Sequence, residues 1–409
     1  MTQFVHLHVH TQYSILDGQA SIQRLVDKAM NDGQPGIAVT DHGDMFGIKE
    51  FYNYVKKVKG KFKDKAAEAE ARIAALRDGT ETCADPAAEI AKCERQLEEC
   101  RRKLAFKPII GCEVYVARRR LHDKEGKPDQ SGYHLILLAK NLEGYHNLAR
   151  IVSYAFIEGF YYRPRVDKEL LRLYHDGIIC CSACLGGELP QAIMHGNIDE
   201  AHRVVEEFKS IFGEDYYLEL QLHPSGNARI DAQVYENQKK VNEVILRLAA
   251  EHGVKYIASN DVHFIMADDA PAHDRLICLN TGRDLDDPNR MRYTFQEYLK
   301  SEEEMAALFP DHPEALATTA EIAAKVESYS LEPLMPNFPI PDDFEIPLDK
   351  LKETFLKKLE DEALRAEVND CASLDDVIAR HPELSERLMI SKQFRYLEYL
   401  TYLGAEKRY

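Results

Sequence analysis

Residues 6–18, HLHVHTQYSILDG, open the chain with three histidines at alternate positions and an aspartate seven residues after the last of them. Because successive side chains of a β-strand point to opposite faces, His6, His8 and His10 can converge on one point. Imidazoles gathered in this way can bind metal ions, and Asp17 adds a carboxylate nearby in the chain. The same pattern also fits a polar, solvated edge strand, so the ends of the other strands must decide between the two interpretations.

The composition of the chain is that of a cytoplasmic protein with no membrane partner. Its 409 residues are 45% hydrophobic and 30% charged, and no apolar run approaches the length of a membrane span. No signal or transit peptide is visible, and the nine cysteines are spaced too irregularly for a secreted disulfide framework. The formal charge of −17 argues against a surface that binds nucleic acid everywhere, but it leaves room for one basic groove.

Apolar, β-rich runs alternate with amphipathic helical patterns up to about residue 265. This alternation favours a parallel α/β sheet or a closed α/β barrel, and a barrel gathers its chemistry at the carboxyl ends of its strands. The seven predicted strands are residues 4–9, 36–42, 107–116, 133–140, 177–184, 215–223 and 254–264.

One segment, residues 61–105, interrupts this alternation with a sequence rich in Ala, Glu, Lys and Arg. It predicts a solvated helical hairpin inserted into a loop, and an arm that docks another protein is the alternative. After residue 285 the strands stop, and helical patterns continue to residue 409 around a proline-rich connector at 331–347. We therefore expect a metal-binding domain over 1–285, with the hairpin at 61–105 as an insertion, and a helical extension over 286–409.

Residues that can bind metal recur at the ends of the predicted strands. Imidazole and carboxylate together suit Zn, Mn or Fe, and one thiolate shifts the preference toward Zn. Eight or nine ligands are too many for one tetrahedral ion, but they fit a cluster of two or three, as in enzymes that hydrolyse phosphate esters. His134 does not fit the pattern, because it precedes its strand. Cys181 and Cys184 have the spacing of a redox pair, without a helix signal after them. The strand-end residues are His8, His10, Asp17, Asp41, His42, Glu113, Cys184, His223, Asp261 and His263.

Several motifs in order resemble the PHP (polymerase and histidinol phosphatase) domain family, in the form that begins the bacterial DNA polymerase III alpha subunit. They are HLHVHTQYSILDG, TDHGDMFGIKEFY, KPIIGCEVYVA, HLILLAKN, GFYYRPRVDKELL, SACLGGELP and ASNDVHF. The later LMPNFPIP, residues 334–341, resembles the connector that leads into the polymerase palm. The resemblance implies an α/β fold, a distorted seven-stranded β/α barrel with an inserted helical hairpin and a C-terminal helical extension leading toward a palm.

The resemblance also implies a trinuclear metal centre. Two or three divalent ions (Zn, Mn or Fe) are expected, with Mg for polymerisation in the full protein. His223, Arg163 and Arg165 are the candidates for holding the substrate phosphate during catalysis. The implied ligands are His8, His10, Asp17, His42, Glu113, His134, Cys184, Asp261 and His263.

We therefore expect a fragment of a replicative DNA polymerase whose first domain is a metal-dependent phosphoesterase, plausibly a 3′–5′ proofreading exonuclease. The expected partners are a DNA 3′ end (single strand or primer terminus) and, in the full protein, the sliding clamp and the proofreading subunit. Two alternatives stay open: a free-standing phosphatase of a small phosphomonoester, and a structural module in which the metals only stabilise a docking surface. The hairpin departs from the family pattern, and the chain is shorter than whole polymerases of this kind.

Overall fold

The computed structural model describes residues 4–332, 339–341, 344, 350, 352, 355–357 and 359–409. Contacts divide the chain into two compact units, Met1–Leu331 and Glu332–Tyr409. Residues 286–331 pack within the first unit, whereas the sequence-based boundary of the metal-binding domain lies at residue 285 and stays a prediction. Most of the LMPNFPIP connector lies outside the described residues.

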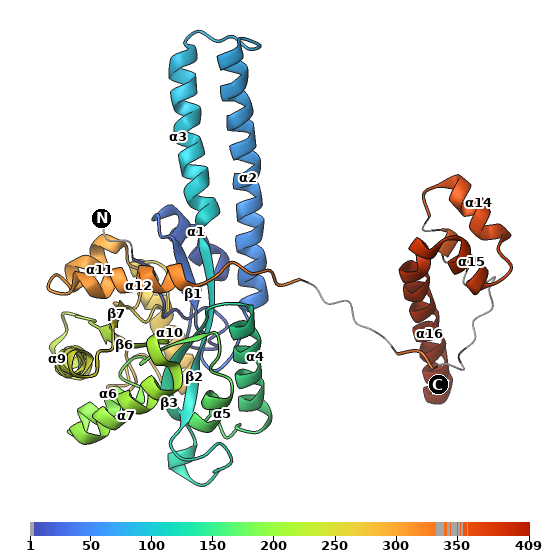
Figure 1. The fold of residues 1–409 in the computed structure, drawn as a ribbon. Helices are drawn as coiled ribbons and strands as arrows, with labels where there is room; N and C mark the ends of the chain where they lie inside the picture. Colours follow the sequence, from blue (N-terminus) through green and yellow to red (C-terminus); the bar gives the residue numbers. More distant parts are fainter. Residues whose placement is uncertain are drawn as a thin grey trace. The chain divides into compact units, whose positions relative to one another are not determined.

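A curled seven-stranded sheet with helices around it forms the centre of the first unit (Figure 1). The strand order is β1-β2-β3-β5-β6-β7, and the short β4 pairs with β2. The pairs β1–β2, β2–β4, β5–β6 and β6–β7 are parallel, but β3 is antiparallel to both β2 and β5, which corrects the expectation of a parallel sheet. The strands are β1 (Gly36–Val39), β2 (Lys107–Ala117), β3 (Gly132–Ala139), β4 (Arg165–Val166), β5 (Ile178–Cys181), β6 (Tyr216–Gln221) and β7 (Tyr256–Ser259).

The histidine segment at residues 4–10 is extended, but it is not a regular strand. It lies between β1 and the residues that follow β7, and it forms backbone hydrogen bonds to both. The segment therefore bridges the two ends of the strand order, as the expected first strand of a barrel would. The bonds are Ala38 N to His6 O (2.9 Å) and Thr40 N to Val9 O (2.8 Å) on one side, and Val262 N to His8 O (3.1 Å) and His10 N to Val262 O (2.7 Å) on the other.

Helices connect and cover the strands, and their starts follow local capping chemistry. Asn141, Asp167 and Asn197 each accept a backbone N–H at the start of their helix. Most of these helices then bury an apolar face in one large core with the sheet, whereas the short α8 buries no residue. They are α1 (Ile22–Asn31), α4 (Leu142–Ile157), α5 (Lys168–Leu173), α6 (Glu188–Met194), α7 (Ile198–Phe212), α8 (Ala228–Asp231), α9 (Tyr235–His252), α10 (Ala270–Thr281), α11 (Glu302–Leu308) and α12 (Pro313–Lys325).

The predicted hairpin consists of α2 (Ile48–Asp78) and α3 (Pro86–Ala105), which extend side by side away from the sheet (Figure 1). The first helix is longer than the insertion alone would give, because it begins at Ile48, before residue 61, and continues into the insertion without a break. Gly79 ends it at a φ of +78°, and Asp85 caps the second helix. A small buried cluster of Ala69, Ile73, Cys93 and Leu97 joins the two helices.

The second unit is helical, as its sequence pattern predicts. A separate small core forms from apolar side chains that include Phe355, Leu359 and Val368. The helices of its described part are α14 (Glu362–Asp370), α15 (Leu374–Arg380) and α16 (Ser385–Arg408).

Candidate metal centre

Side chains that could hold a metal ion, from seven separate parts of the first unit, meet at one end of the sheet. Their ligand atoms form three groups, and in each group these atoms lie within 4.8 Å of one another. Neighbouring groups share a member, so the three are parts of one cluster. The groups are His10, His42 and His263; His8, His10 and Glu113; and Glu113, His134 and Cys184.

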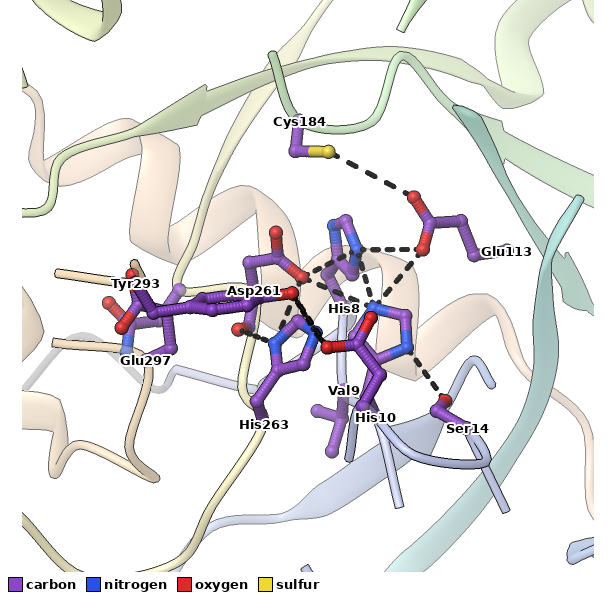
Figure 2. A network of polar contacts seen from close by, with 12 residues as sticks. His8, Val9, His10, Ser14, Glu113, Cys184, Asp261, His263, Tyr293 and Glu297 are labelled. Atoms are coloured by element: carbon purple, nitrogen blue, oxygen red, sulfur yellow. Dashed lines mark hydrogen bonds and ion pairs between the residues drawn. The ribbon is translucent and has the colours of Figure 1, made fainter. Parts of the chain in front are cut away.

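Glu113 lies at the centre of this cluster and is fully buried. Its Oε1 is 2.5 Å from His134 Nδ1 and 3.9 Å from Cys184 Sγ. Its Oε2 lies 3.2 Å from His10 Nε2 (Figure 2). The same oxygen is 2.7 Å from His42 Nδ1. One carboxylate thus presents an oxygen to each side of the cluster.

Asp261 completes the set on the side of the first two histidines. Its Oδ1 lies 3.0 Å from His8 Nε2 and 3.2 Å from His10 Nε2, and these two nitrogens are 3.2 Å apart. On the remaining side, Asp17 Oδ2 is 3.0 Å from His42 Nε2, and Asp17 Oδ1 is 4.0 Å from His263 Nε2. All nine predicted ligands therefore lie in one continuous cluster.

Neighbouring polar groups orient the imidazoles. His8 Nδ1 lies 2.6 Å from Glu219 Oε1, and His263 Nδ1 lies 2.8 Å from the backbone oxygen of Asp261. His10 Nδ1 contacts Ser14 Oγ at 3.0 Å, and Ser14 in turn donates to Asp41. When Nδ1 donates to an oxygen, Nε2 keeps its lone pair, and in all three histidines Nε2 faces the cluster. Asp41 therefore acts outside the cluster, through Ser14.

Unusual backbone conformations occur next to several site residues. A positive φ is uncommon for residues other than glycine and is tolerated where the surrounding structure fixes it. One of these residues is the predicted ligand Asp261 itself, with φ +46°. The others adjoin Asp17, Arg163, Cys184 and the rim of the site: Leu16, Tyr162, Ala183 and Phe295.

Burial and charge set the protonation of the site in the absence of ions. Burial would raise the pKa of Glu113 and of Asp261, yet the histidines beside them hold both pKa values well below the ordinary range. Burial alone would lower the pKa of His8, but Asp261 and Glu219 hold it well above its usual value. Burial lowers the pKa of His263 to about 3, so this imidazole is neutral. A proton on His8 is one that a bound cation would displace.

The donor set fits divalent transition metals. Three buried atoms inside the cluster, His42 Nδ1, Glu113 Oε2 and Asp261 Oδ1, have no hydrogen-bond partner. Buried polar atoms normally find such partners. Here His42 Nδ1 faces Glu113 Oε2, and Asp261 Oδ1 faces the Nε2 atoms of His8 and His10. Imidazole, carboxylate and one thiol together are the ligands that Zn, Mn and Fe accept.

The direction of β3 explains why His134 belongs to the site although it precedes its strand. Because β3 runs antiparallel to β2, its first residues lie beside the last residues of β2, with His134 opposite Tyr115. Three contributors were missed by the sequence analysis, and one of them, Ser14, lies within the first motif. Glu219 is a charged residue within an apolar strand, which is a usable signal, whereas Tyr293 belongs to no motif and donates its hydroxyl to Asp17 at 2.9 Å.

The three residues predicted to hold phosphate lie in different environments in the structure. Arg163 is exposed and lines the cavity over the cluster. Arg165 is fully buried and donates to the backbone oxygens of Gly159 and Leu121, so its placement is structural and does not support the predicted role. His223 lines the cavity, but both of its ring nitrogens already have hydrogen-bond partners. Nδ1 contacts the side chain of Gln238, and Nε2 contacts the backbone oxygen of Asn260.

His6 also lies apart from the site, although its spacing allowed it to join the other histidines. Its Nε2 is 2.9 Å from the backbone oxygen of Lys300, and its ring packs edge-on against Phe4.

The cavity over the cluster has a volume of about 460 Å³. Its walls bring together Asp17, His42, His134, Cys184, Asp261 and His263 with Arg163, Arg292 and Tyr293. A small substrate, or the end of a larger one, can therefore reach the ligand atoms from solvent.

None of the helices in the described parts of the chain combines the length and the apolar composition that a membrane span requires.

Among curated proteins, the DNA polymerase III subunit alpha of Borreliella burgdorferi is 37% identical over 348 residues, which are 84% of this chain and 26% of that protein. The subunits of Treponema pallidum and Thermus aquaticus are 38% and 36% identical over 83% of this chain and 25% and 24% of those proteins. The chain thus spans about a quarter of the length of these curated relatives.

A solved structure named as a metal-dependent phosphoesterase, from Bifidobacterium adolescentis, is 13% identical, with a TM-score of 0.32, over 64% of this chain and 88% of that one. The PHP domain family matches residues 6–223, more than half of the chain's 409 residues. This region holds the histidine segment, His42 and Glu113, which supply members of all three groups of ligand atoms. The chain belongs to the PHP domain family.

Proposed function

We propose that this chain is part of a bacterial DNA polymerase III alpha subunit and that its PHP site hydrolyses phosphodiester bonds at the 3′ end of DNA. The observation that carries the activity is the presence of three overlapping groups of ligand atoms, two of which contain Glu113, below a cavity that opens to solvent. The likeness to three alpha subunits over 83–84% of the chain supports the polymerase origin.

Two or three bound Zn, Mn or Fe ions would supply Lewis acidity toward a phosphoryl oxygen and would lower the pKa of a water molecule toward neutrality. All nine predicted ligands are expected to hold these ions. Glu113 is suited to two neighbouring ions at once, because its two oxygens face different groups of ligands. Glu219, Ser14 and the backbone oxygen of Asp261 keep three imidazoles turned toward the cluster.

The substrate is held by residues of the cavity wall. Arg163 is exposed there, and its guanidinium group lies over the ring of Tyr115, 5.7 Å from the ring centroid. A guanidinium group can form two hydrogen bonds to a phosphate, and it strengthens them with its charge. We assign phosphate binding to Arg163 and a structural role to Arg165. His223 shapes the wall of the cavity.

The wider roles belong to the same proposal. In the full subunit, DNA would be polymerised with Mg, and the sliding clamp and the proofreading subunit would be partners. A cytoplasmic location agrees with nine cysteines that are all free of disulfides.

A nuclease assay on the 409-residue chain tests the activity. A 5′-labelled single-stranded oligonucleotide should shorten from its 3′ end in Mn²⁺ or Zn²⁺, and chelation should stop the reaction. Asp261→Ala should abolish it, whereas the exposed Asp268→Ala is the matched control. Hydrolysis that persists in Asp261→Ala would indicate a contaminating nuclease.

The same assay separates the two alternatives. Turnover of p-nitrophenyl phosphate without turnover of the oligonucleotide would support a phosphatase of small monoesters. A fully metal-loaded chain that hydrolyses neither substrate would support a purely structural metal cluster.

A further inference from the structure

A second cavity adjoins the metal centre, between α8 and the loop at residues 282–292. Its volume is about 520 Å³, and it shares Met291 and Arg292 with the cavity over the ligands. The next residue, Tyr293, contacts both Asp17 and His263 Nε2. Because Met291 and Arg292 line both cavities, the two cavities are direct neighbours.

The wall of this second cavity is strongly one-sided in charge. It contains three arginines and no carboxylate among its described residues. In a chain with a formal charge of −17, such a concentration of positive charge is a local exception. Its lining is Asn227, Arg229, Ile230, Gln233, Pro288, Asn289, Arg290, Met291 and Arg292.

Two of the three arginines have no compensating charge. Arg290 forms two hydrogen bonds with the carboxylate of Asp274, at 2.5 and 2.6 Å. Arg229 and Arg292 instead both donate to the backbone oxygen of Pro288, at 2.9 and 3.5 Å, and Arg292 also donates to other backbone oxygens of the loop. No carboxylate of the described chain forms an ion pair with either of them.

This arrangement holds two like charges close together. Both guanidinium groups lie within hydrogen-bond distance of the same carbonyl oxygen, and a carbonyl group carries no net charge to offset their repulsion. An anion between them would relieve that repulsion, and planar guanidinium groups are suited to phosphate.

We propose that the second cavity binds a backbone phosphate of a DNA strand whose 3′ end lies at the metal centre. The inference rests on the proposed function and deepens it, because it makes the substrate a polynucleotide whose phosphates contact both cavities. A small phosphomonoester would reach the metal centre alone and would gain nothing from Arg229.

The test uses Arg229→Gln in the 409-residue chain, because Arg229 lines the second cavity and not the cavity over the metals. Arg283→Gln is the matched control. It removes the same charge from the loop at residues 282–292, where Arg283 is exposed and pairs with Asp287. Arg283 lines neither cavity. Binding of a 5′-fluorescein dT10 with phosphorothioate linkages is followed by anisotropy over a range of salt concentrations in Mn²⁺.

Arg229→Gln should weaken binding about tenfold, as expected for the loss of a hydrogen bond between charged groups. It should also reduce the slope of log K against log salt by about 0.7, the value for one phosphate contact on a single strand. Arg283→Gln should change neither quantity. Turnover of bis(p-nitrophenyl) phosphate should be the same in all three proteins.

Unchanged binding in Arg229→Gln, equal losses in both variants, or no oligonucleotide binding by the wild type would each overturn the proposal. Because binding is measured without hydrolysis, a weakened Arg229→Gln together with an inactive wild type would retain the phosphate site and reject the proposed exonuclease.

Discussion

Glu113 Oε1 lies 2.5 Å from His134 Nδ1, across the antiparallel pair of strands β2 and β3. The other oxygen of Glu113 lies 2.7 Å from His42 Nδ1, on the opposite side of the cluster. One buried carboxylate therefore joins two groups of ligands that would otherwise hold separate ions. This relationship predicts how the metal content depends on single residues.

Glu113→Gln should lower the bound metal by more than one ion per chain, because an amide binds metal poorly and both of its neighbouring groups lose a charged ligand. His134→Ala removes a ligand from only one group of ligand atoms, so it should lower the metal content by about one ion per chain. Metal analysis of the purified proteins measures both values, with the exposed Glu98→Gln as the control. Equal losses in Glu113→Gln and His134→Ala would contradict the shared position of Glu113.

Ser14→Ala should weaken metal binding without removing any ligand. The hydroxyl of Ser14 connects His10 Nδ1 to Asp41, so its loss frees the ring to change its tautomer and orientation. Loss of an orienting partner of this kind typically lowers metal affinity by about 10- to 100-fold. Competition with a chromophoric chelator measures the affinity. Ser153→Ala, on the exposed face of α4, should leave it unchanged.

The alternate histidines and the strand-end carboxylates could be predicted from sequence because they follow local rules. Side chains alternate along an extended segment, and the ends of parallel strands share an edge. The place of His134 could not be predicted in this way, because it depends on the direction of β3, which tertiary packing decides.

The different placements of Arg163 and Arg165 also could not be predicted from the sequence. They are two residues apart in a single motif, yet one lines the cavity and the other is buried among backbone oxygens. The strand that holds Arg165 has two residues, too few for a periodic pattern to indicate which way its side chains point. Tyr293 reaches the site from a loop without any recognisable motif, so only the folded chain reveals it.

Removal of the outer part of the hairpin should leave a folded protein that binds metal. Deletion of residues 66–99 with a short Gly-containing link removes the cluster that the two helices share only with each other. A surface excursion of this kind adds little to the core, and shortening it changes loop entropy only slightly. Thermal unfolding and metal analysis are the measurements, and aggregation or metal loss would contradict this view.

Deletion of all of residues 61–105 should be harmful by comparison, because the base of the hairpin is part of the core. Phe62 packs against the main hydrophobic core, and Lys103 lies over its ring and donates to Asn31. The longer deletion should therefore unfold at a lower temperature than the shorter one.

The stability of the first unit should depend on pH through Lys300. Burial lowers its pKa to about 8 from the ordinary 10.5. Between these two pH values the unfolded chain binds more protons than the folded chain, so the free energy of unfolding rises as the pH increases from 8 to 10.5. At about 1.4 kcal/mol per pKa unit, the gain is on the order of 3 kcal/mol.

Lys300→Met removes this titration. The free energy of unfolding of the wild type should therefore increase relative to that of the variant as the pH rises from 7 to 10.5. Urea denaturation at a series of pH values measures it. A difference that stays constant with pH would mean that Lys300 titrates normally in the folded protein.

Substitutions of Arg163 and Arg165 should affect different properties: substrate binding for Arg163 and stability for Arg165. Arg163→Gln should raise the KM for the oligonucleotide and change the unfolding temperature little, because Arg163 is exposed at the cavity and its guanidinium group lies 5.7 Å from the centroid of the Tyr115 ring. Arg165→Gln should lower the unfolding temperature, because it leaves the backbone oxygens of Gly159 and Leu121 without their buried donor. Kinetics of the folded Arg165→Gln protein should match the wild type. If Arg165→Gln raised KM while retaining full stability, the guanidinium group of Arg165 would have to reach the phosphate, and the assignment of these two arginines would be reversed.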